Sequence, residues 1–73
     1  MNGHVYKVIE IVGSSEKSID DAIKTAVAEA SKTIRNMDWF EVVQTRGQLK
    51  EGRIGHYQVT LKIGFHLETK ISK

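Results

Sequence analysis

The tryptophan at position 39 is the residue whose type and placement most directly suggest a chemical role. It is the only tryptophan in 73 residues, and it begins the segment WFEVVQTRGQ, which resembles a β-strand. An indole can pack inside a subunit, fill an interface, or stack on a flat heteroaromatic ligand. Packing is the commoner role for a lone tryptophan, because this residue type is enriched at interfaces. The pattern alone therefore favours packing and leaves ligand binding as the alternative.

A glutamine on the following segment is the second residue suited to recognition. Gln58 stands in GHYQVTLKIGFHLE, and its amide can both donate and accept hydrogen bonds. If Gln58 and Trp39 share one face of a sheet, the indole can stack on a flat ring while the amide reads the ring's edge. Taken alone, a glutamine on a strand is more often solvated. The elements that carry these two residues decide whether they share a face.

Four elements are predicted, in the order strand, helix, strand, strand, which gives an α+β domain of β-α-β-β type over residues 1–73. The expected bounds are about 4–13, 16–35, 38–50 and 53–68. Ser18 and Asp21 are placed as a capping box, with Ser15 as an alternative cap one turn earlier. Asn36 can adopt the left-handed conformation that ends a helix.

The last strand shows the clearest alternation in the chain. One side of it is apolar and predicts the face that packs on the helix; its residues are Tyr57, Val59, Leu61, Ile63, Phe65 and Leu67. The strand over 4–13 is apolar on both sides, which is unusual for a strand covered on one side only. Its second face is expected to meet another subunit or a folded-over part of the same chain.

A two-residue turn at Glu51-Gly52 would join the last two strands as a hairpin. Residues whose numbers sum to 103 then pair, so Phe40 lies opposite Ile63 on the core face. Glu41 lies opposite Lys62 on the other face, and this favourable charge pair supports the register.

The same register places Trp39 on the face away from the helix. Gly64 stands opposite and leaves space beside the indole, and Thr45 is expected opposite Gln58. A bulge near Gly47 would shift the pairs beyond it. The resulting surface suits a flat heteroaromatic ligand.

Composition excludes several functional classes. A domain of this size buries only roughly 60% of its unfolded surface, so a lone monomer would be marginal. Cysteine is absent, which excludes disulfides, and the three histidines are scattered, so no metal site is predicted. Self-association is therefore the expected source of additional stability. A net charge of +2 with no basic stripe predicts no nucleic-acid partner. No membrane span or signal peptide is predicted, and a cytoplasmic location is expected.

Several ordered stretches together resemble one known family. HVYKVIEIVGSS, ASKTIRN, WFEVVQTRGQ and GHYQVTLKIGFHLE are similar to dodecins, which are small flavin-binding proteins. The resemblance runs from about residue 4 to residue 68. It implies a three-stranded antiparallel sheet wrapped around one helix, and assembly as a hollow homododecamer.

The resemblance also implies a cofactor and roles for particular residues. Dodecins bind flavins in pairs at subunit interfaces, with the rings stacked between symmetry-related tryptophans. Trp39 matches that tryptophan, Gln58 matches the glutamine that bonds the flavin edge, and Arg46 matches an arginine near the phosphate of flavin mononucleotide (FMN). FMN or riboflavin is the expected non-covalent ligand, and coenzyme A is a further possibility in this family.

His66 departs from the family pattern. Bacterial relatives often carry an arginine there, which helps to hold the phosphate end of the flavin. A neutral histidine lacks the charge and the bidentate fork of arginine. Preference for the phosphorylated flavin is therefore in doubt, and we expect FMN binding to strengthen below about pH 6.5, where an ordinary histidine gains charge.

The expected function is flavin storage or sequestration, with quenching of the stacked flavins. No nucleophile–base pair, glycine-rich phosphate loop or carboxylate pair suggests catalysis, so no enzyme is expected. The alternative is an oligomeric structural or interaction shell without a flavin. A flavin enzyme is a third class, which would need an open approach to the reactive ring.

Overall fold

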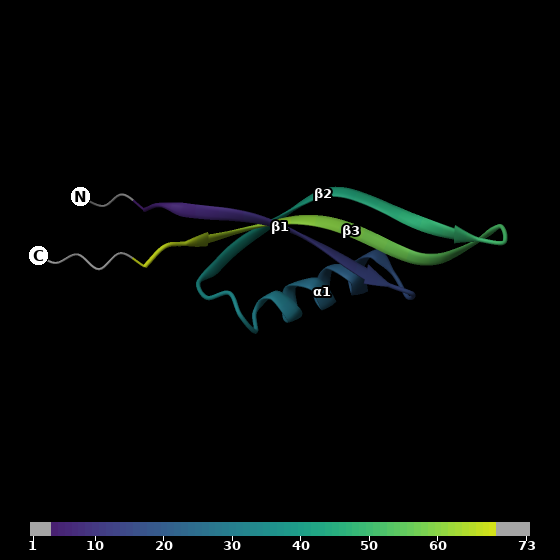
Figure 1. Ribbon diagram of the computed structural model, residues 1–73, viewed down its shortest axis with the longest axis horizontal. Helices are drawn as coiled ribbons and strands as arrows, with labels where there is room; N and C mark the ends of the chain where they lie inside the picture. Colours follow the sequence, from purple (N-terminus) through teal and green to yellow (C-terminus); the bar gives the residue numbers. More distant parts are fainter. Residues whose placement is uncertain (1–3, 69–73) are drawn as a thin grey trace, which may run out of the picture.

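The computed structural model describes residues 4–68 and contains four regular elements. Figure 1 shows them in chain order: β1 (Tyr6–Ser15), α1 (Ile19–Ala30), β2 (Met37–Lys50) and β3 (Arg53–His66). This order confirms the predicted β-α-β-β arrangement. The predicted strand bounds are close, although β1 ends at Ser15 rather than at Gly13.

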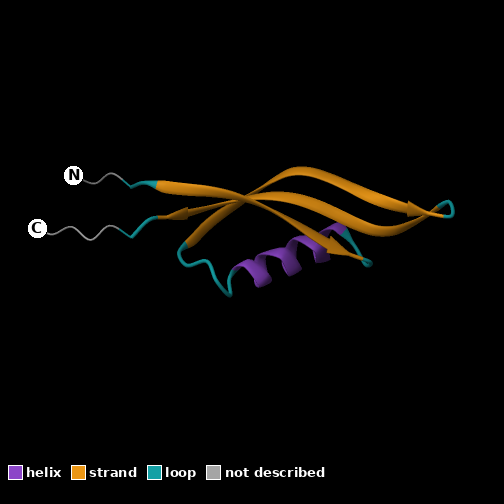
Figure 2. Ribbon diagram, viewed as in Figure 1, coloured by secondary structure: helices purple, strands orange, loops and turns teal. Residues whose placement is uncertain are grey.

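The three strands form one antiparallel sheet in the order β1-β3-β2, so β3 is the central strand. Helix α1 lies against one face of this sheet, and within residues 4–68 no helix covers the other face (Figure 2). The β2–β3 hairpin continues well past the end of the helix (Figure 1). The sheet therefore offers one helix-free face along its whole length.

The start of α1 follows from two serines. The Ser18 hydroxyl accepts a hydrogen bond from the Asp21 amide at 3.0 Å, which confirms the predicted N-cap. The Ser15 hydroxyl accepts a bond from the Lys17 amide at 2.9 Å and donates one to the Asp21 carboxylate at 2.7 Å. These bonds build a turn before the helix, so α1 begins after Ser18 and not at residue 16.

The end of α1 comes earlier than predicted. The helix was expected to reach residue 35, but it ends at Ala30 and is followed by a turn. The Ser31 hydroxyl donates to the Ala28 carbonyl at 2.7 Å and competes with regular helix bonding. Asn36 has a φ of 65°, the left-handed conformation predicted for it, but it lies beyond this turn and directs the chain into β2.

The buried core lies between α1 and the middle of β3. Its members are Ala22, Ala26, Val59, Leu61 and Ile63. The small alanines let the helix approach β1 so closely that a Cβ on Gly13 would overlap the Ala22 carbonyl. Leu67 was predicted to join this core but is 44% exposed. It follows the last residue of β3, where the sheet has ended.

Much apolar surface stays outside this core. Helix α1 packs on β1 and β3, so Phe40 and Val42 on the helix side of β2 are half-exposed. On the helix-free face, the β1 residues Tyr6, Val8 and Val12 are also about half-exposed. The two apolar faces predicted for the first strand therefore exist, and the outer one is uncovered in a single subunit.

The predicted hairpin register is confirmed at both ends of the hairpin and is wrong in its middle. Its turn is formed by Glu51 and Gly52, which have φ angles of 53° and 77°, as a tight hairpin turn requires. The pairs expected nearest α1 are present: Trp39–Gly64, Phe40–Ile63, Glu41–Lys62 and Val42–Leu61.

The error lies beyond Val42, where an irregularity shifts the pairing by one residue. Thr45 therefore pairs with Val59, and it is Arg46 that pairs with Gln58. This shift at Val42–Gln44 was not expected. A second irregularity lies between Gln48 and Leu49, near Gly47, where a bulge was expected. It restores the predicted register, so Lys50 pairs with Arg53 next to the turn. A bulge reverses the alternation of a strand, so Thr45 joins the core side.

Candidate functional site

The indole of Trp39 lies on the helix-free face, as predicted. It is 42% exposed and covers Gly64 so closely that a Cβ on that glycine would overlap the ring. The space expected beside the indole is therefore occupied by the indole itself. Tyr6 meets it edge-on, with ring centroids 5.1 Å apart and an interplanar angle of 66°. Backing by Gly64 and Tyr6 holds the ring in place while part of it stays accessible.

Arg46 and Gln58 form a second group on the same face. The Arg46 Nε donates to the Gln58 Oε1 at 3.0 Å, and the pair is exposed. This bond occupies one lone pair of the glutamine oxygen and leaves its NH2 group and the terminal guanidinium nitrogens free to donate. The structure thus joins two residues that the sequence had assigned separate roles, and it replaces Thr45 as the neighbour of Gln58.

His66 points from β3 towards the same face and is bound by Asp38. The His66 Nδ1 and the Asp38 Oδ2 are 2.8 Å apart, and both side chains are about 40% exposed, at 42% and 37%. Because Gly64 and His66 are two residues apart on β3, their Cα atoms are separated by about 7 Å. His66 therefore stands at the edge of the indole position.

The predicted site residues fall into two groups within one subunit. Trp39 covers Gly64, whereas Arg46 pairs with Gln58, six residues away along β3. At a rise of about 3.3 Å per residue, this is roughly 20 Å. The tricyclic ring of a flavin is too short to reach both groups in the same subunit. One ligand can contact both only if a second subunit brings its own group to the first.

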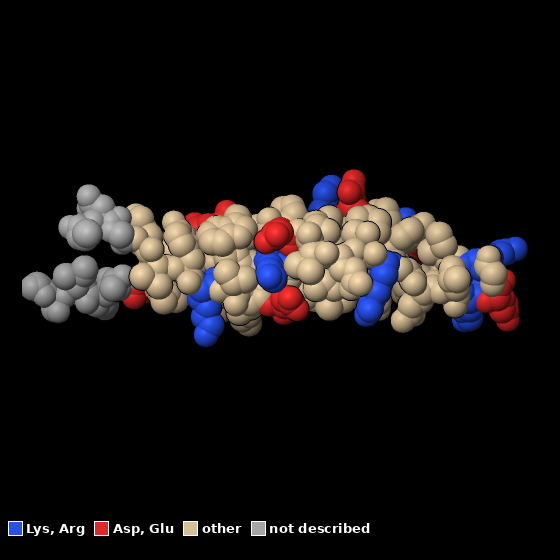
Figure 3. Space-filling model, turned by 90° about the horizontal axis from the view of Figure 1, so that it is seen from above, with Lys and Arg blue, Asp and Glu red and all other residues tan. Residues whose placement is uncertain are grey.

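The charges on this face are mixed. Glu10, Lys62 and Glu41 form one row across β1, β3 and β2. Figure 3 shows the face with positive and negative groups interspersed and no large patch of one sign. Among residues 4–68, no group of three or more histidines and acidic residues is placed to hold a metal ion. In the same range, no helix is long and apolar enough to cross a membrane.

Sequence reasoning missed two residues of this site, Asp38 and Tyr6. Regular alternation would place Asp38 on the face opposite to Trp39. An irregularity between Met37 and Trp39 interrupts this alternation, so the side chains of Asp38 and Trp39 can lie on the same face. A charged residue directly before the only tryptophan was the available signal. Tyr6 could have been found only from the β1–β3 register, which pairs it with His66.

A single helix on a three-stranded sheet, with a tryptophan held on the open face, defines a small α+β domain fitted for stacking interactions. A family model described as Dodecin matches residues 5–68. Dodecin of Thermus thermophilus is 50% identical over 66 residues, which cover 90% of this chain and 96% of that protein.

Solved structures agree with the match in sequence. Dodecin from Streptomyces coelicolor superposes with a TM-score of 0.90 at 50% identity, covering 96% of this chain and 100% of that one. Dodecin from Streptomyces davaonensis gives a TM-score of 0.88 at 50% identity, covering 93% and 100%. The chain belongs to the dodecin family.

Proposed function

We propose that this protein is a flavin-binding storage or sequestration protein, in which Trp39 stacks on the isoalloxazine ring. The observation that carries the proposal is the indole itself. It is fixed on the sheet by Gly64 and Tyr6 yet keeps 42% of its surface exposed. A rigid aromatic ring that is not covered by its own subunit is suited to stack on another flat ring.

The ligand site is formed between subunits. The distance of roughly 20 Å along β3 separates Trp39 from Arg46 and Gln58, so one flavin needs contributions from two copies. A twofold axis supplies them symmetrically, because each copy then donates the same residues to its partner. Gln58 would bond the ring edge, and Arg46 and His66 would lie near the flavin tail. FMN and riboflavin are the candidate ligands.

Exposed apolar residues support assembly. Phe40 and Val42 on one face, and Val8 and Val12 on the other, are about half-exposed. Large exposed apolar surfaces usually mark interaction sites. A domain of this size also gains stability by association. The homo-oligomer, with twelve subunits as in the family pattern, is part of the proposal.

Stacking favours storage over catalysis. Two flavins stacked as a pair between two indoles have both faces of each ring covered, which denies substrates the approach that a redox enzyme needs. Electron transfer from the indole would also quench the excited flavin. These effects protect the cell from a reactive pigment and do not help turnover.

The second candidate is a structural shell in which Trp39 packs against a neighbouring subunit without a ligand. The same exposed apolar residues favour it. Absorbance near 450 nm of the protein as purified, together with its mass in solution, separates the two. We expect a yellow oligomer. A colourless oligomer that takes up no added flavin would favour the shell, and a monomer would contradict both proposals.

A further inference from the structure

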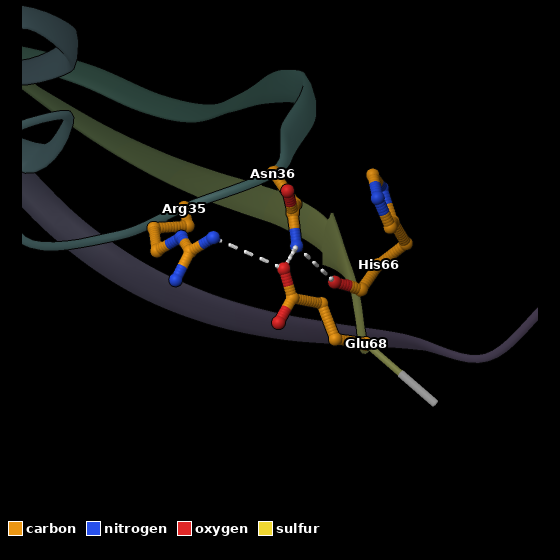
Figure 4. Close-up of polar contacts among 4 residues, drawn as sticks. All are labelled: Arg35, Asn36, His66 and Glu68. Atoms are coloured by element: carbon orange, nitrogen blue, oxygen red, sulfur yellow. Dashed lines mark hydrogen bonds and ion pairs between the residues drawn. The ribbon is translucent and has the colours of Figure 1, made fainter. Parts of the chain in front are cut away.

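Asp38, which the resemblance gave no role, pairs with His66. The two atoms that join the pair, Nδ1 and Oδ2, are 2.8 Å apart. The main chain of His66 is fixed by Asn36, whose carbonyl accepts from the His66 amide at 3.3 Å and whose Nδ2 donates to the His66 carbonyl at 3.5 Å. Figure 4 shows the carbonyl of His66 turned towards Asn36 and Glu68, with the imidazole pointing away from them.

The chemistry of this contact sets the tautomer of His66. An ionised carboxylate accepts hydrogen bonds and donates none. The proton of the neutral imidazole must therefore sit on Nδ1, where it is donated to Asp38. Nε2 then carries a lone pair and can only accept. A flavin tail that reaches Nε2 finds an acceptor, which suits a hydroxyl group and not the oxygens of a phosphate.

The charged groups near His66 also disfavour a phosphate. Besides Asp38, the face around Gly64 carries Glu10 and Glu41, and the only lysine among them, Lys62, lies between these two carboxylates in the same row. Within one subunit, this end of the site therefore carries three carboxylates and one lysine. Arg46 of the same subunit is roughly 20 Å away. A second copy placed by the proposed twofold axis would add one Arg46 to this end, so a doubly charged phosphate here still meets more negative than positive groups.

We propose that Asp38 is a specificity-determining residue that acts through His66. It holds His66 as an acceptor and keeps this end of the site negative, so that near pH 7.5 the site favours an uncharged, hydroxylated flavin tail over one that ends in phosphate. This inference rests on the proposed function, because it concerns the same Trp39 site.

The test compares the affinities of riboflavin and FMN at pH 7.5 in wild-type protein, in Asp38→Asn and in Asp20→Asn. Asp20 is a matched control because it lies on α1, on the other side of the sheet. We expect Asp38→Asn to shift the ratio of the two affinities towards FMN by roughly three- to tenfold, since one repulsive charge near the phosphate is removed. Asp20→Asn should leave the ratio unchanged.

The imidazole ¹⁵N shifts of His66 give a readout that does not depend on flavin. At pH 8 the wild type should show Nδ1 protonated and Nε2 unprotonated, and Asp38→Asn should lose this preference. A ratio that does not move in Asp38→Asn, or a His66 protonated at Nε2 in the wild type, would overturn the inference while leaving flavin binding intact. If wild-type protein binds neither flavin, the proposed function fails and this inference fails with it.

Discussion

The position of the Trp39 indole depends on Gly64, which has no side chain. The ring covers Gly64 so closely that no Cβ would fit beneath it, and this contact fixes the orientation of the indole on the sheet. The second group of the face, roughly 20 Å away along β3, is less constrained. Arg46 is exposed and Gln58 is partly buried, and the hydrogen bond between them is the contact that holds the two side chains.

The first prediction concerns the indole. Trp39→Ala should weaken flavin binding by about 1–3 kcal/mol or more, the range for loss of one aromatic stacking partner. Trp39→Phe should retain part of the affinity because a smaller ring still stacks. Isothermal titration of both variants measures the change, and circular dichroism checks that the fold is kept. Equal affinity in wild type and Trp39→Ala would remove the stacking role.

The second prediction concerns the amide. Gln58→Ala should reduce flavin affinity by about 1–3 kcal/mol, the cost of one or two hydrogen bonds in a site that excludes water. Gln48→Ala is the matched control, since Gln48 is an exposed glutamine on β2 with no side-chain bond to Arg46. The same titration applies to both. If the two variants lose affinity equally, Gln58 does not contact the ring edge.

At the level of elements, the cap at Ser18 determines where α1 begins. Replacing it by alanine should lower the free energy of unfolding by about 1 kcal/mol, because the Asp21 amide loses its partner. Ser31→Ala, at the other end of the same helix, should change it by less than about 0.5 kcal/mol, as for most surface substitutions. Denaturant midpoints at one fixed protein concentration compare the two. A larger effect at Ser31 would show that the helix end controls stability instead.

Several features were predictable from sequence: the order of elements, the hairpin turn, the N-cap and the placement of Trp39 on the open face. They follow from the hydrophobic period, the turn residues and the capping residues, which are local properties of the chain. The pairing of Gln58 with Arg46 was not, since a single bulged residue near Val43 reverses the alternation of the strand. The role of Asp38 was missed for the same reason. The early end of α1 also escaped prediction, because the apolar spacing continues past Ala30 while the backbone turns away.

The whole molecule is a thin structure with two partly uncovered faces, and its stability should depend on assembly. If folding and association are coupled, the thermal midpoint should rise as protein concentration increases. Scanning calorimetry over about a hundredfold range of concentration tests this, with the mass of the native species measured alongside. A midpoint independent of concentration in a protein of monomer mass would contradict the proposal that subunits complete the site.

The central claim is that flavin stacks on Trp39 at an interface between copies, and a fluorescence titration tests it most directly. Protein freed of ligand is titrated into riboflavin and into FMN while flavin emission is followed. We expect nearly complete quenching at about one flavin per subunit, since each symmetric copy contributes one indole. Emission that stays unchanged at micromolar protein would contradict the claim and leave the shell without a ligand as the better account.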